Sequence, residues 1–181
     1  MQYNLKMLEG KKEPVNLDEM LSYRFGDGTS FPTSYIEFAR QYGFGLTCGE
    51  FLIYIPMGGY CDSFFSQSCA IKGTYSDVLG NPNDVWFDIE PDVDFERLKR
   101  LIPFASSDNG NYLFWDSART VPNEMDIYIT DFRGLGFVKA ASSLYELIEK
   151  MTDPKQFKEV FPLFYQEELP ATFMPFQKHE D

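Results

Sequence analysis

The sequence has little of what most catalytic and metal sites need. It contains one histidine, His179, two residues before the C-terminal end. Ser-His and Cys-His catalysis require a base held within hydrogen-bond reach of its nucleophile, and an end segment is a poor place to hold one. Histidine-based zinc ligation is disfavoured for the same reason. The phosphate-binding pattern G-x-x-x-x-G-K-[ST] is absent, and Gly43, Gly45 and Gly49 miss the dinucleotide-binding spacing by one residue. We therefore predict a protein that is not an enzyme and binds no cofactor or metal.

Cysteine is also scarce, and it forms no recognisable pattern. Cys48, Cys61 and Cys69 include no C-x-x-C pair. Small secreted domains use denser, even sets, so we expect a reducing compartment and three buried, small hydrophobic side chains. The first residues lack the charged and apolar segments of a signal peptide, and no apolar run approaches the ~20 residues that span a bilayer. These features predict a cytoplasmic protein.

Basic residues are outnumbered, with 16 Lys and Arg against 28 Asp and Glu and a net charge of -12. A field of this sign repels nucleic acids and anionic membranes, so neither is an expected partner. Residues 73–96 contain seven acids and no Lys or Arg. Five of these acids occur at every second position, which would place them on one side of an extended chain. They are Asp88, Glu90, Asp92, Asp94 and Glu96.

Three interpretations of this acidic segment stay open. The first is a solvated loop, because acidity also serves solubility. The second is a docking surface for a basic protein, with the five carboxylates as candidate contacts. The third and least favoured is chemistry. Paired-carboxylate hydrolysis needs one acid in an apolar pocket, and no EF-hand spacing indicates calcium.

Capping signals and apolar periodicity predict four helices. Asn16 and Ser143, each three residues before a glutamate, have capping-box spacing, which predicts a short helix after Asn16 and a longer one over 143–151. Residues 32–42 place four apolar side chains on one helical face. A shorter helix is expected after Pro154.

Strands are predicted over five segments: 50–56, 101–105, 111–116, 125–130 and 137–138. Asn109 and Gly110 accept the positive φ angles of a tight turn, so the second and third strands form a hairpin. Apolar and polar residues alternate over 125–130, which predicts one buried face and one face in water. Residues 62–80 fit no single pattern and are compatible with an irregular helix.

Helices, then hairpin-connected strands, then helices predict an α+β fold with a mainly antiparallel sheet flanked by helices. With 181 residues, 18 Phe and 11 Tyr, the chain is expected to form a single domain with an aromatic core. We divide it into a polar, irregular arm over 1–15, the domain over 16–154, and a C-terminal helix with a tail over 155–181. From Leu169 the tail is expected to run extended over the surface.

Several short motifs in one order resemble a known family. The motifs are Phe31-Pro-x-x-Tyr35 with Gly43, residues 102–105, the turn 108–111 with the strand 113–116 that ends in Asp116, and residues 138–148. Together they are similar to SMI1/KNR4-like proteins of the SUKH superfamily over about residues 30–150. Residues 62–82 and the tail beyond Pro154 have no counterpart in that pattern.

The resemblance implies an α+β domain without a cofactor. Bacterial members of this family are commonly immunity proteins that bind and neutralise a cognate toxin, frequently a nuclease, and fungal relatives are regulatory interaction modules. We therefore expect a non-catalytic, protein-binding domain, with a basic toxin as its partner. A regulatory scaffold for another endogenous protein is the alternative, and a carboxylate-dependent hydrolase is a distant one.

Overall fold

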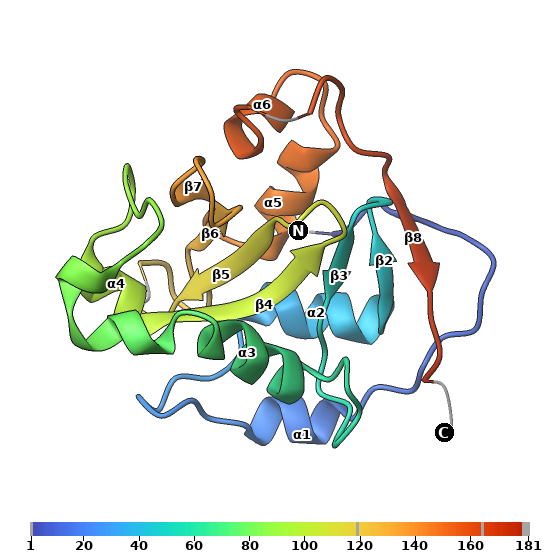
Figure 1. The fold of residues 1–181 in the computed structure, drawn as a ribbon. Coiled ribbons are helices and arrows are strands. Elements are labelled where there is room, and N and C mark those ends of the chain that lie inside the picture. The colour runs from blue at the N-terminus through green and yellow to red at the C-terminus, as the bar shows by residue number, and fades with distance from the viewer. Residues whose placement is uncertain (1, 119, 164, 179–181) are drawn as a thin grey trace.

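A computed structural model describes residues 2–118, 120–163 and 165–178 (Figure 1). His179 lies outside these residues. Within them, one sheet has the strand order β1-β8-β2-β3-β4-β5-β6-β7, and its neighbours are antiparallel except for β1 with β8. The strands are β1 (Lys6–Met7), β2 (Gly45–Thr47), β3 (Phe51–Ile53), β4 (Leu101–Ser107), β5 (Tyr112–Asp116), β6 (Ile127–Thr130), β7 (Val138–Ala141) and β8 (Thr172–Pro175). The predicted α+β fold with a mainly antiparallel sheet is confirmed.

Helices pack around this sheet (Figure 1). The α-helices are α1 (Leu17–Ser22), α2 (Thr33–Gln41), α3 (Phe64–Gly73), α4 (Phe95–Arg100), α5 (Leu144–Met151) and α6 (Phe157–Val160), with two 3₁₀ turns, η1 (Ser76–Gly80) and η2 (Pro82–Asp84). None of the described helices has both the length and the apolar character to cross a bilayer.

The predicted helix starts are confirmed by their caps. The Asn16 side chain accepts a hydrogen bond from the backbone N–H of Glu19 at 3.2 Å, and Ser143 Oγ accepts one from that of Glu146 at 3.2 Å. Each bond satisfies an N–H group that the first helical turn cannot pair internally. At the other end of α2, Gly43 has a φ of 81°, the left-handed conformation that ends many helices.

The predicted hairpin is also confirmed, as β4 and β5. Gly110 takes the left-handed conformation with a φ of 80°, and its N–H donates to the Ser107 carbonyl at 3.0 Å. The Asn109 side chain has a different role, because its amide donates to Glu50 Oε1 at 2.7 Å. This bond links the hairpin tip to the turn before β3.

Aromatic side chains cover both faces of β5. On one face, Trp115 stacks on Phe104 at 4.1 Å and meets the Tyr35 ring of α2 edge-on at 4.8 Å. On the other face, the Phe114 ring lies 5.3 Å from that of Phe137 and 6.2 Å from that of Tyr75.

This second cluster corrects the prediction for residues 125–130. Tyr128 and Thr130, expected in water, are buried at 2% and 0% exposure. Tyr128 lies opposite Phe114 in the β5–β6 ladder, so both belong to the face that Tyr75 and Phe137 help to cover. Alternation in a sequence shows which residues share a face, and it does not show whether another layer packs on that face.

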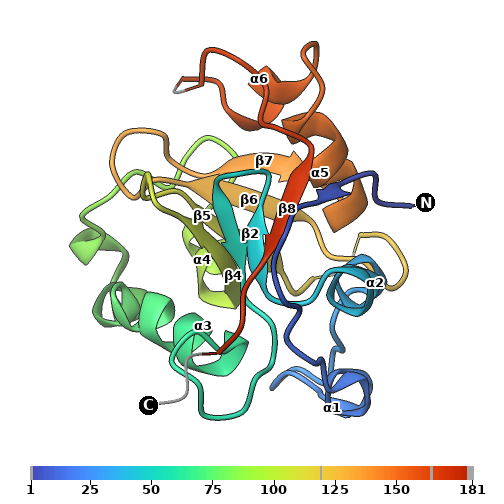
Figure 2. The same cartoon turned by 90° about the vertical axis from the view of Figure 1, so that its right-hand side faces the viewer.

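Both ends of the chain are more ordered than predicted. The tail does not run over the surface, because its strand β8 lies in the sheet between β1 and β2, with Phe173 fully buried (Figure 2). The N-terminal arm supplies β1, and its Tyr3 and Leu5 are buried. Met7 of β1 pairs in parallel with Phe173 of β8. Pairing between positions more than 160 residues apart leaves no local signal in either segment.

Residues 62–80, ambiguous in sequence, contain α3 and η1. The prediction of three buried thiols holds for Cys48 and is wrong for Cys61 and Cys69, which are exposed. Cys61 precedes α3 in a turn, and Cys69 lies in α3 on a different side from the buried Phe64 and Ile71. Burial also raises the pKa of the Cys48 thiol to about 12.

Candidate functional site

Residues 73–96, which we call the acidic layer, cover the Phe114 face of the sheet. They run from the end of α3 through η1 and η2 to the start of α4 and form the green region at the left of Figure 1. Tyr75, Val78, Phe87 and Val93 are buried and attach the layer to the domain. Its acidic side chains face outward or bond to polar groups of the surrounding chain.

The acidic layer is not one extended strand, so the prediction that its alternate carboxylates share one side is corrected. Asp94 caps α4, accepting a hydrogen bond from the Arg97 N–H at 2.7 Å, and the chain is helical from Phe95 onward. Asp92 Oδ2 accepts from the backbone N–H of Lys139 at 2.8 Å. Glu96 pairs with a lysine one helical turn later at 2.7 Å. Three of the five candidate residues therefore already have partners inside the protein.

The other two candidates, Asp88 and Glu90, have exposed side chains. Among the described residues, neither carboxylate has an ion-pair partner within 4.0 Å, and the same holds for Asp77 and Asp84. Asp84 accepts one hydrogen bond, from the Asn81 side chain at 3.0 Å. Of the five alternating carboxylates, Asp88 and Glu90 are thus the two that have neither a hydrogen bond nor an ion pair among the described residues, and both precede Pro91.

A hollow of about 640 Å³ opens beside Asp88 and Glu90. Apolar side chains form much of its wall: Pro82, Val85, Phe87, Ile89, Pro91, Phe95 and Leu135. A second hollow of about 440 Å³ shares four residues with the first: Ile89, Glu90, Pro91 and Phe95. Trp86 stands in sequence between Val85 and Phe87, which line the first hollow. It is 61% exposed, and its ring lies 4.9 Å from that of Phe87. The surface combines apolar concavity, an exposed indole and free carboxylates.

An ion cluster that the sequence did not reveal anchors the C-terminal end of this layer. Arg100 donates to both oxygens of the buried Asp116, from Nε at 2.6 Å and from Nη2 at 2.9 Å. Arg97 Nε lies 3.2 Å from Asp116 Oδ2, and its guanidinium sits 5.6 Å from the centre of the Tyr128 ring. The hydrogen bonds that Arg100 donates to Asp116 raise the pKa of Arg100. In the sequence, the sign of this cluster is an acid at the end of a strand that follows a basic helix. The tertiary fold brings this acid and the arginines of the helix together.

The conspicuous motif around Phe31 and Tyr35 is structural in this protein. The Tyr35 hydroxyl donates to the Tyr54 carbonyl at 2.6 Å, and burial raises the pKa of Tyr35 well above its ordinary value. Ser34 Oγ donates to Glu124 at 2.6 Å and accepts from the Leu144 N–H at 3.1 Å. These bonds join the N-terminal ends of α2 and α5 and engage the hydroxyls of Ser34 and Tyr35 inside the protein.

Among the described residues, no group of three or more His, Cys, Asp or Glu side chains could hold a metal ion. The acidic layer offers charge and apolar contact for recognition. A positively charged partner with a protruding apolar side chain would match both properties at once.

Comparison with known proteins gives one match. A family model described as SMI1-KNR4 cell-wall (SUKH_6) matches residues 28–148. No curated protein and no solved structure matches the chain significantly. The matched residues include the acidic layer, the β4–β5 hairpin, and the start of α5.

Proposed function

Because the chain belongs to the SMI1-KNR4 (SUKH) family, we propose that it is a cytoplasmic immunity protein that binds and neutralises a basic toxin through the acidic layer. The observation that carries this proposal is the exposed Trp86 beside the uncompensated Asp88 and Glu90. Tryptophan is among the residues that most often dominate the free energy of protein binding. The adjoining hollow of about 640 Å³ could receive a side chain of the partner.

Charge supports the same type of partner. The net charge of -12 and the absence of Lys and Arg from residues 73–96 favour encounter with a positively charged surface. A nuclease toxin presents such a surface, because its substrate groove must attract phosphate groups. An acidic protein that covers the groove would exclude the nucleic acid by competition and needs no catalytic group of its own.

The test begins with the product of the adjacent gene. Co-expression of this chain should rescue cells from that product, and purified proteins should form a complex. Trp86→Ala should weaken the complex at least about tenfold. The double substitution Asp88→Lys and Glu90→Lys should slow association and reduce its dependence on salt.

A matched control changes the same charge elsewhere. Glu167 and Glu168 are exposed and form no ion pair among the described residues, so Glu167→Lys with Glu168→Lys alters the net charge equally. Equal slowing by both double variants would show a general charge effect and overturn the proposed interface. A neighbouring gene that encodes no toxin, together with capture of an endogenous regulatory protein, would replace the immunity role by a scaffold role.

A further inference from the structure

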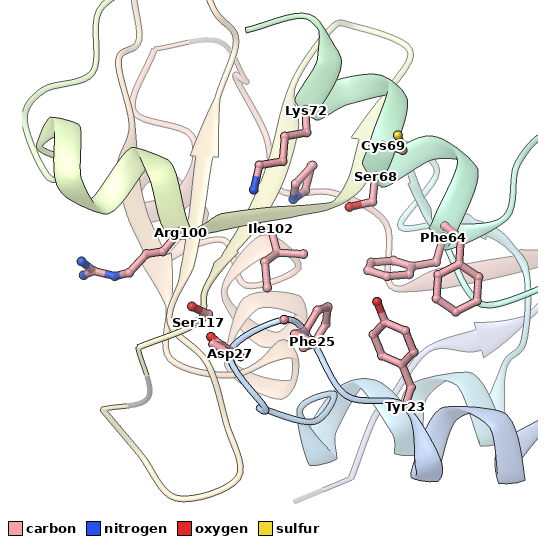
Figure 3. Close-up of a pocket in the computed structure, with 13 residues that line it drawn as sticks. Tyr23, Phe25, Asp27, Phe64, Ser68, Cys69, Lys72, Arg100, Ile102 and Ser117 are labelled. Atoms are coloured by element: carbon pink, nitrogen blue, oxygen red, sulfur yellow. The ribbon is translucent and has the colours of Figure 1, made fainter. Parts of the chain in front are cut away.

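A separate hollow of about 460 Å³ lies between α3, the loop that follows α1, and the start of β4 (Figure 3). Its volume falls in the range of ordinary small-molecule sites, about 300–1,000 Å³. Apolar and aromatic side chains form its walls: Tyr23, Phe25, Phe64, Phe65, Ile102 and Pro103. None of these residues belongs to the acidic layer.

The charged groups around this hollow differ in whether they already have a partner inside the protein. Arg100 donates two hydrogen bonds to Asp116, which pairs its positive charge with a carboxylate. Asp27 Oδ1 accepts hydrogen bonds from the Thr29 N–H at 2.9 Å and the Thr29 hydroxyl at 2.6 Å. Lys72 has no hydrogen bond or ion pair among the described residues, although its side chain is half-buried. Lys72 is therefore an unpaired positive charge on the α3 side of the hollow, while Asp27 on the loop keeps a negative charge on a carboxylate that already accepts hydrogen bonds.

Two uncharged hydrogen-bond donors line the same hollow as the Lys72 ammonium group. Figure 3 shows Lys72 extending from α3 toward β4, with the hydroxyls of Ser68 and Tyr23 directed toward the space between α3 and the loop. Neither hydroxyl has a hydrogen-bond partner among the described residues. A few polar groups converging on an apolar hollow are typical of a ligand site, in which they fix the orientation of the bound molecule.

We propose that this hollow binds a small amphiphilic anion, with an aromatic or aliphatic body and a single carboxylate or sulfonate group. The apolar body packs against Phe25 and Ile102, and the anionic group accepts hydrogen bonds from Lys72 Nζ and Ser68 Oγ. This site requires a negative ligand, whereas the acidic layer requires a positive partner. It is therefore a second function, and it does not rest on the proposed immunity role.

The experiment uses two fluorescent probes of nearly the same shape. 8-Anilinonaphthalene-1-sulfonate carries the anion, and N-phenyl-1-naphthylamine lacks it. We expect one-to-one binding of the sulfonate by the native chain. Lys72→Met keeps most of the apolar stem and should weaken sulfonate binding about three- to fivefold, the size of a half-exposed ion pair, without affecting the neutral probe. Lys11→Met, which removes an exposed lysine outside the hollow, should change neither affinity.

A second variant locates the bound probe. Ser68→Phe places a ring into the hollow and should abolish binding of both probes, while an unchanged urea midpoint shows that the fold is intact. Equal affinity of the native chain and the Lys72→Met variant for the sulfonate would overturn the charge assignment. Binding of both probes that survives Ser68→Phe would overturn the site itself. Neither outcome bears on the toxin complex, which Lys72→Met should leave unchanged.

Discussion

Replacing Phe173 by alanine should destabilise the protein by about 3–5 kcal/mol, the usual cost of removing a buried phenylalanine ring. The Phe173 ring is fully buried in the tail strand β8, with its centre 5.1 Å from that of Tyr42 and 5.9 Å from that of Phe38. The backbone of Gly45 on β2 also lies against it, at a position where a Cβ atom would meet the ring. The cavity left by alanine therefore opens between α2 and the sheet, where neither side can easily collapse.

Urea unfolding followed by circular dichroism measures this loss. A domain of this size has about 5–15 kcal/mol of stability, so the variant should stay folded and yield a transition. Met174→Ala is the control, because its side chain is half-buried on the opposite side of the same strand. We expect it to cost about 1 kcal/mol. A loss below about 1 kcal/mol for both variants would show that β8 does not contribute to the core.

Three further predictions concern other parts of the fold. Asp116→Asn should cost about 2 kcal/mol in urea unfolding, less than for a fully buried ion pair because the two α4 arginines are 35% and 36% exposed. Partial burial opposes ionisation of Glu146, but hydrogen bonds from a backbone N–H and a lysine outweigh this effect and lower the pKa of Glu146. The ionised carboxylate therefore contributes its full stabilisation above the ordinary pKa of 4.5, and this contribution is lost as the pH falls through the lowered pKa. Glu146→Gln should therefore reduce the loss of stability between about pH 7 and about pH 3, and an unchanged acid response would contradict this. In thiol titration, Cys61 and Cys69 should react in the native protein and Cys48 only after unfolding.

Local chemistry accounts for the parts of the fold that the sequence could predict. The caps of α1 and α5 use a side chain and an N–H group three residues apart, so the whole interaction is visible in four consecutive residues. The hairpin turn likewise depends on Gly110 and its immediate neighbours. The buried positions of Phe104, Leu113 and Trp115 follow once the hairpin is recognised, because apolar strand residues pack inward.

Long-range pairing accounts for what the sequence could not predict. β1 and β8 consist of two and four residues, and each forms its strand hydrogen bonds with a segment far along the chain. Lys6 and Met7 are themselves exposed, so their composition resembles that of an irregular arm. Lys6 and Met7 form a strand because their backbone pairs with that of β8.

The acidic layer shows why a surface site is harder to predict than a core. Five carboxylates at alternate positions look equivalent in sequence, yet a carboxylate is available to a partner only if the fold does not use it. Asp92 is bonded to the backbone of β7, far along the chain, whereas Asp94 is used by its immediate neighbours, as the cap of the first turn of α4. Asp88 and Glu90 remain free only because the residues that could neutralise them lie elsewhere in the fold. Leaving out the carboxylates that are bonded within the protein therefore narrows the candidate interface from the whole alternating run to Asp88 and Glu90, two and four residues after the exposed Trp86.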